Sequence, residues 1–124
     1  MANQTDVRRI LLALPDVTED AGSFHFRVAG KQIAWVYPER VDPRRPRVPN
    51  SDVLVVWTGD DLEKQSLLAL DARKFFTTAH YDGYPAVLVH LRKVGEAELT
   101  GLLTDAWRSR APKRLVRAWE QSPA

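Results

Sequence analysis

The residues best suited to chemistry stand in the HYDGY segment, residues 80–84, which precedes a strongly apolar run. Histidine is the side chain that most often acts as a general base, and a nearby carboxylate can orient its ring. His80 and Asp82 are only two residues apart, however, and residues at this spacing in an extended turn do not generally orient one another. Asp82-Gly83 is typical of turns, because glycine adopts positive φ without strain. We therefore predict that the segment is structural and directs the chain into a buried strand.

The other residues favour no enzymatic reaction. The chain has no cysteine, which excludes disulfides, thiolate zinc sites and cysteine nucleophiles. Its serines stand in no nucleophile-elbow sequence, and the glycine-rich loop and lysine of a nucleotide hydrolase are missing. The acids between residues 16 and 20 lack the ligand spacing of a calcium loop. We expect a protein that is not an enzyme and that binds no metal or cofactor.

Binding chemistry is better represented, because basic residues gather in two segments of a chain whose net charge is only +2. The proline-rich segment 38–50 carries four arginines, and residues 108–124 carry five basic residues and one acid. Such basic segments can contact phosphates, and a helix start adds free backbone N–H groups. The residues predicted to contact nucleic acid are Arg44, Arg45, Arg47, Lys113, Arg114 and Arg117.

The sequence contains no recognition helix rich in Asn, Gln and Arg, so we expect DNA binding of low sequence specificity. The alternative is a module that docks a protein partner or a small ligand. Prolines in the 38–50 segment have the spacing of polyproline ligands, which supports that alternative. His80, Tyr81 and Trp107 are the candidates to line a ligand pocket, although tryptophans at this spacing with aliphatic residues are usually core residues.

The elements that must position these residues follow from the spacing of apolar side chains. Residues 7–14 show helical spacing, with Thr5 as the expected N-cap and Pro15 as the stop. The following PDVTEDAG segment is predicted to be a polar loop. Two alternating segments on either side of Ala29-Gly30 predict a β-hairpin.

In the second strand of this hairpin, we expect Ile33, Trp35 and Tyr37 to share a face. Segment 38–50 is predicted to be a stiff, extended connection rather than a strand, because proline donates no backbone hydrogen bond. The β-branched run 52–58 predicts a buried strand.

Asp60 and Glu63 resemble a capping box, so a helix is expected from there to Leu70. A further strand is predicted over 85–91, with His90 on the face opposite Val87 and Val89. Two more helices are expected, one after Gly95 and one at Pro112. The order α-β-β-β-α-β-α-α predicts a single α+β domain over residues 1–124, with helices packed on an antiparallel sheet.

The chain is expected in the cytoplasm. It has no apolar run near the ~20 residues that span a bilayer, and its N-terminus lacks the pattern of a signal peptide. The absence of cysteine fits a reducing compartment.

Four segments resemble the MmcQ/YjbR-like family of small bacterial domains. They are LALPDVTED, FHFRVAGKQIAWVYP, FFTTAHYDGYPAVLVHL and ELTGLLTDAWRSRAPKRLVRAW, and they follow the family's order along nearly the whole chain, from residue 12 to residue 119. The resemblance implies a fold like that of frataxin and CyaY, a sheet backed by helices in a "double wing" arrangement. Family members are often labelled DNA-binding.

Two features of this chain bear on what the resemblance implies. The family commonly has proline before His-Tyr-Asp-Gly, where this chain has Ala79, so the geometry of the turn is less constrained. A frataxin-like fold also implies iron binding by an acidic ridge. The first helix, TDVRRILLAL, has one acid and two arginines, which disfavours such a ridge.

Overall fold

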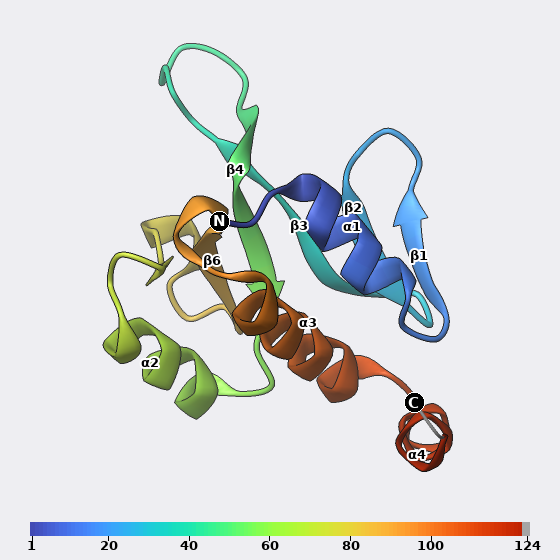
Figure 1. Ribbon diagram of the computed structural model, residues 1–124. Coiled ribbons are helices and arrows are strands. Elements are labelled where there is room, and N and C mark those ends of the chain that lie inside the picture. The colour runs from blue at the N-terminus through green and yellow to red at the C-terminus, as the bar shows by residue number, and fades with distance from the viewer. Residues whose placement is uncertain (123–124) are drawn as a thin grey trace.

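A six-stranded antiparallel sheet organises the computed structural model, which describes residues 1–122 (Figure 1). The strand order is β1-β2-β3-β4-β6-β5. With its helices, the sheet confirms the predicted α+β class. The elements are α1 (Gln4–Leu12), β1 (Val17–Asp20), β2 (His25–Val28), β3 (Lys31–Glu39), β4 (Val48–Trp57), α2 (Asp61–Leu70), β5 (Phe75–Phe76), η1 (Ala79–Tyr81), β6 (Ala86–His90), η2 (Leu91–Lys93), α3 (Glu96–Arg110) and α4 (Lys113–Gln121).

The helix boundaries follow the local capping signals. α1 begins two residues earlier than an N-cap at Thr5 would give, because Asn3 accepts a hydrogen bond from the Asp6 backbone N–H and Asp6 accepts one from the Asn3 backbone N–H. Asp60 caps α2 as predicted, accepting a 2.8 Å hydrogen bond from the Glu63 backbone N–H. None of the described helices is long and apolar enough to cross a membrane.

The predicted hairpin is formed by β2 and β3, with φ of +50° at Ala29 and +81° at Gly30. Positive φ at both central residues is what the tightest hairpin turns require. The register shifts farther along, because Arg27 pairs with Gln32 while Phe26 pairs with Ala34.

This β-bulge leaves Ile33 as the extra residue. Ile33 consequently faces one cluster of buried side chains, and Trp35 and Tyr37 face the other. The prediction that these three residues share a face was wrong for this reason.

The polar loop predicted after α1 contains a strand, β1, which pairs with β2 at the edge of the sheet. Its acids are balanced by arginines from neighbouring elements. Arg8 donates to both carboxylate oxygens of Glu19 at 2.8 and 2.9 Å, and Arg27 donates to Asp20. The short acidic segment is therefore stabilised by partners that its own sequence does not show.

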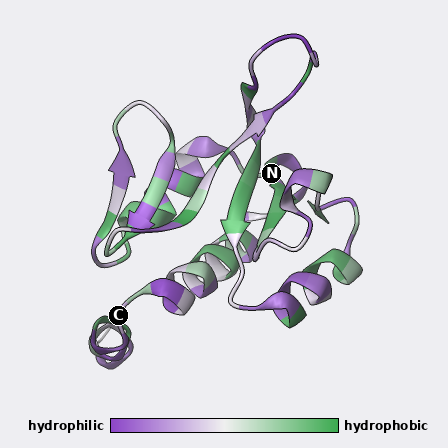
Figure 2. Ribbon diagram, turned by 180° about the vertical axis from the view of Figure 1, so that it is seen from behind, coloured by the Kyte–Doolittle hydropathy of each residue, from purple (hydrophilic) through white to green (hydrophobic). Residues whose placement is uncertain are grey.

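The proline-rich segment also differs from its prediction. β3 and β4 extend into it as a two-stranded ribbon in which Pro38 pairs with Pro49 and Glu39 with Val48. Because proline has no backbone N–H, these two facing residues donate no hydrogen bond to each other. We call residues 38–49 the wing; it projects from the rest of the chain in Figure 1 and is mostly hydrophilic in Figure 2.

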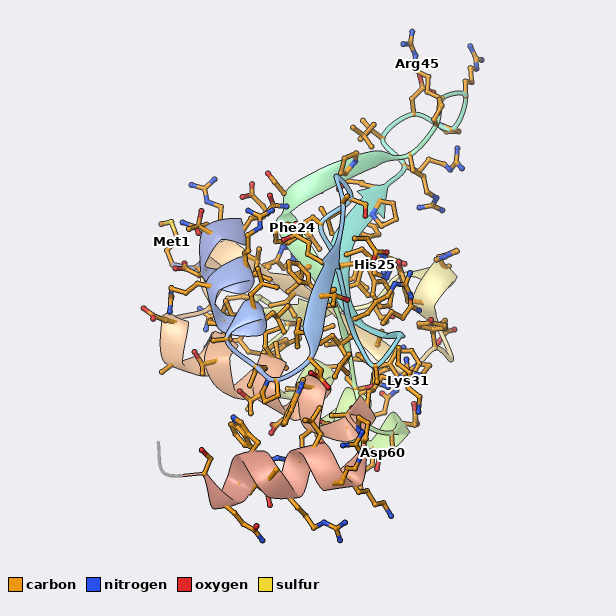
Figure 3. The ribbon with its side chains drawn as sticks, turned by 90° about the vertical axis from the view of Figure 1, so that its right-hand side faces the viewer. Met1, Phe24, His25, Lys31, Arg45 and Asp60 are labelled. Carbon is orange, nitrogen blue, oxygen red and sulfur yellow. The ribbon has the colours of Figure 1, made fainter. Side chains whose placement is uncertain are left out.

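Buried side chains form two clusters, one on each face of the sheet. The first lies under α1 and α3 and includes Leu11, Leu54, Leu103 and Trp107. The second we call the aromatic face; segment 79–85 contributes Tyr81 and Tyr84 to it, against Trp35 from the sheet. Figure 3 shows the sheet edge-on, with α1 to one side of it.

Candidate functional site

The wing carries three exposed arginines, Arg44, Arg45 and Arg47, and Figure 3 shows Arg45 at its far end. The loop is held by its own side chains. Arg47 donates a 3.0 Å hydrogen bond to the Pro38 carbonyl, and Arg40 donates one of 2.9 Å to the Arg45 carbonyl. These bonds and the prolines pre-organise the loop, so that little conformational entropy is lost when it docks.

The second basic patch lies on α4, where Lys113, Arg114 and Arg117 are all exposed. The opposite side of this helix packs against the first cluster through Leu115 and Trp119. Figures 1 and 3 place α4 and the wing at opposite ends of the molecule. The six predicted phosphate-contacting residues therefore belong to two separate surfaces.

The HYDGY segment forms the predicted turn into the next strand: η1 is followed by Gly83, with φ of +77°, and then by β6. Two tyrosines of the segment point into the aromatic face. The Tyr81 hydroxyl accepts a 3.2 Å hydrogen bond from Trp35 Nε1, and the Tyr84 hydroxyl accepts one of 2.7 Å from Gln32. Burial raises the pKa of Tyr81, an effect that the Trp35 hydrogen bond partly offsets.

A buried lysine holds this turn in place. Lys64 on α2 is only 2% exposed, and its Nζ donates to the carbonyls of Tyr81 at 2.6 Å and Tyr84 at 2.7 Å. Lys64 was not among the residues predicted from the sequence. Its spacing with Leu67 and Leu68 could have identified it, since positions i, i+3 and i+4 place the lysine on the apolar stripe of its helix.

The structure does not bring together the predicted pocket residues His80, Tyr81 and Trp107. His80 is exposed and its ring meets the edge of Tyr81, with centroids 4.9 Å apart. Trp107 is completely buried in the cluster under the helices, where its Nε1 donates to the Pro15 carbonyl at 2.9 Å. Trp107 is therefore a core residue, as is usual for tryptophan.

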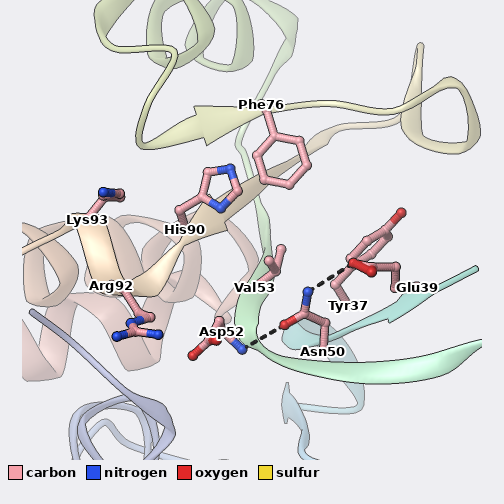
Figure 4. Close-up of a pocket in the computed structure, with 9 residues that line it drawn as sticks. All are labelled: Tyr37, Glu39, Asn50, Asp52, Val53, Phe76, His90, Arg92 and Lys93. Carbon is pink, nitrogen blue, oxygen red and sulfur yellow. Dashed lines mark hydrogen bonds between the residues drawn. The ribbon is translucent and has the colours of Figure 1, made fainter. Parts of the chain in front are cut away.

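A pocket of about 480 Å³ opens instead at the base of the wing (Figure 4). His90 lies in it on the predicted face, with its ring stacked 4.3 Å from that of Phe76. None of the lining residues was predicted to form a pocket, because they come from separate strands and from η2. They are Tyr37, Glu39, Asn50, Asp52, Val53, Phe76, His90, Arg92 and Lys93.

The other histidine of the sheet, His25, stacks on Trp35 with ring centroids 5.3 Å apart. Burial lowers its pKa, with a further contribution from the nearby Arg27. The His25 side chain is half-buried, because it packs on the aromatic face through Trp35. Within residues 1–122, no three His, Asp or Glu side chains are close enough together to hold a metal ion.

Comparisons with known proteins agree with the segment resemblance. The family model YjbR matches residues 12–109. Uncharacterized proteins of Mycobacterium bovis and Mycobacterium tuberculosis are each 38% identical over 125 residues, an alignment that covers 96% of this chain and 96% of the relative. No solved structure matches. A match over most of the chain, with relatives of this identity and coverage, shows that the protein belongs to the YjbR family.

Proposed function

We propose that the protein binds nucleic acid through the phosphate backbone, with the wing as its main contact surface and with low sequence specificity. The observation that carries this proposal is the set of three exposed arginines, Arg44, Arg45 and Arg47, on a projecting ribbon. A two-stranded ribbon is narrow enough to enter the major groove of DNA, and arginine forks bind phosphate oxygens in a bidentate way.

The patch on α4 is proposed as a secondary contact. It lies at the other end of the molecule, so a short duplex would meet one patch at a time. The wing ranks first because its arginines project on a pre-organised loop, whereas those of α4 lie along a helix that is packed against the body.

Anisotropy titrations of labelled duplex and single-stranded DNA at several salt concentrations test this ranking. The variant Arg44→Ala/Arg45→Ala removes two charges from the wing, and Arg114→Ala/Arg117→Ala removes two from α4 as the matched control. We expect the wing variant to lower the log–log salt slope by about 2, and the control to lower it less.

Two results would count against the proposal. One is a wild-type protein that shows no salt-dependent binding at micromolar concentration in low salt. The other is an equal loss of affinity in the two double variants, which would show that the wing has no special role.

We also propose that the protein acts without catalysis and in the cytoplasm. The chain has no cysteine and forms no disulfide, which fits a reducing compartment. The HYDGY histidine, His80, stands exposed against Tyr81, an arrangement that serves packing better than proton transfer.

A further inference from the structure

The pocket at the base of the wing has flat walls. Phe76 and His90 stack on each other at an interplanar angle of 19°, and both are half-buried, so part of each ring remains accessible. Tyr37 lies across the pocket from them, and Val53 lies between (Figure 4). Rings arranged in this way favour a planar, aromatic ligand that can stack on them.

The charges of the pocket are separated along its length. Arg92 and Lys93, from η2, lie at one end, and Glu39 lies beside Asn50 at the other (Figure 4). Neither Arg92 nor Lys93 forms a side-chain hydrogen bond or ion pair with any residue of the described range 1–122. Two cations that have no partner at the mouth of a pocket favour a ligand with an anionic group at that end.

The opposite end offers hydrogen-bond acceptors. Glu39 accepts a 2.9 Å hydrogen bond from the Asn50 side chain through Oε2, and Asn50 Oδ1 accepts one of 3.0 Å from the Asp52 backbone N–H. Glu39 Oε1 remains as an acceptor at this end, whereas the Asp52 carboxylate lies farther along the pocket, on the side of Arg92 (Figure 4). Carboxylates accept hydrogen bonds from the amino group of cytosine, and asparagine pairs with adenine.

We infer that this pocket binds a nucleotide that carries an amino base. The base stacks on an outer face of the Phe76–His90 ring pair, its amino group donates to the Glu39 end, and its phosphate meets Arg92 and Lys93. The volume of about 480 Å³ falls within the roughly 300–1,000 Å³ of small-molecule pockets. This site is separate from the phosphate contacts of the wing tip and goes beyond the proposed function.

Two sources present this chemistry, a free mononucleotide and an unpaired nucleotide of a single strand. Calorimetry and NMR titration with AMP and CMP, beside IMP and UMP, test the shared chemistry. IMP and UMP keep the ring and the phosphate but lack the amino group, so we expect them to bind about tenfold more weakly. Adenosine, which lacks the phosphate, should also bind about tenfold more weakly than AMP.

Two variants test the location of the site. Phe76→Leu removes a stacking ring and keeps an apolar side chain, and Arg92→Ala removes an exposed cation that cannot affect folding through the core. Each should weaken AMP or CMP binding about tenfold. The matched control is Arg73→Ala, because Arg73 is exposed, pairs with Asp71 and does not line the pocket; it should leave binding unchanged.

The sources are separated by a single-stranded oligonucleotide titrated under the same conditions. Binding much tighter than that of AMP or CMP, and sensitive to Phe76→Leu, assigns the pocket to a strand; equal or weaker binding assigns it to the free nucleotide. The inference is overturned if no nucleotide binds at millimolar concentration, or if Phe76→Leu and Arg92→Ala bind as the wild type does.

Failure of this inference and failure of the proposed function give different results. Phe76→Leu should leave duplex binding intact, because the bases of a duplex are not free to enter the pocket. Arg44→Ala/Arg45→Ala should leave mononucleotide binding intact. Duplex binding without nucleotide binding therefore overturns only the pocket, and nucleotide binding without duplex binding overturns only the wing.

Discussion

The two faces of the central sheet are packed in different ways. Under α1 and α3 the cluster is largely aliphatic, with completely buried residues such as Leu54, Leu99 and Leu103. On the aromatic face, buried aliphatic residues of the sheet such as Val55 and Leu88 are packed against rings from the sheet and from segment 79–85. These rings are Trp35, Tyr37, Trp57, Phe76, Tyr81 and Tyr84.

Hydrogen bonds between side chains also join the rings of the aromatic face to the sheet. His25 and Gln32 are bonded at 3.1 Å, Gln32 donates to Tyr84, and Trp35 donates to Tyr81. A long helix supplies enough apolar atoms to cover a sheet by itself, whereas a short turn must be held by directional contacts. We therefore expect the covered face to be sensitive to lost volume and the aromatic face to single polar atoms.

The largest effect is expected on the covered face. Leu103→Ala should lower the free energy of unfolding by about 3 kcal/mol, because it leaves a cavity at a completely buried position. Urea unfolding followed by tryptophan fluorescence measures this loss. Leu62→Ala is the control, since Leu62 is 76% exposed and should change stability little; similar losses in both variants would break the comparison.

On the aromatic face, Lys64→Met should lower the free energy of unfolding by about 2 kcal/mol although it hardly changes volume. The reason is that the carbonyls of Tyr81 and Tyr84 lose their shared donor. The same urea titration measures it, with Gln65→Met as the exposed control on the same helix. A Lys64→Met protein as stable as the wild type would show that the turn does not need this cation.

Tyr81→Phe should have a smaller effect, about 1 kcal/mol at neutral pH, because Trp35 Nε1 loses its acceptor. Burial raises the pKa of Tyr81 in the folded protein, so the unfolded chain loses this proton first as pH rises. Stability from this group is therefore complete below about pH 10 and declines above it. Unfolding titrations from pH 8 to 11 should show a shallower decline in the variant than in the wild type.

The smallest effect concerns His25. Burial lowers the pKa of its imidazole, so the unfolded chain takes up a proton first as pH falls. The contribution of His25 is complete above about pH 6.5 and is lost as pH falls below that value. His25→Gln should therefore flatten the decline in melting temperature between pH 7 and 5; an unchanged pH profile would remove His25 from the polar network of the aromatic face.

Most of the fold could be predicted from the sequence, because the helices and the central strands carry their own signals. The apolar run of β4, the cap at Asp60 and the Ala29-Gly30 turn are all local. The face that each β3 side chain takes was not predictable from alternation, since the bulge at Ile33 depends on how β2 pairs with β3. Strand β1 was missed because its stability comes from Arg8 and from other distant partners.

The sites were less predictable than the fold. The arginines of the wing were identified from composition, but their separation from the patch on α4 depends on the tertiary arrangement. The pocket joins Tyr37, Asn50, Phe76 and His90, which only the strand order brings together. Lys64 resembles any helical lysine until its spacing with the apolar stripe of α2 is considered.

The wing has a consequence for how this protein can vary. In the two outermost residue pairs of the wing, Pro38–Pro49 and Glu39–Val48, the apolar residues Pro38, Val48 and Pro49 belong to neither hydrophobic cluster. Side chains alternate along a strand with a period of two. Adding or removing two residues in each strand of the wing would therefore keep every side chain of the sheet beneath it on its present face. The reach of the tip can therefore change in even steps, as an adjustable spacer, while the domain beneath it stays the same.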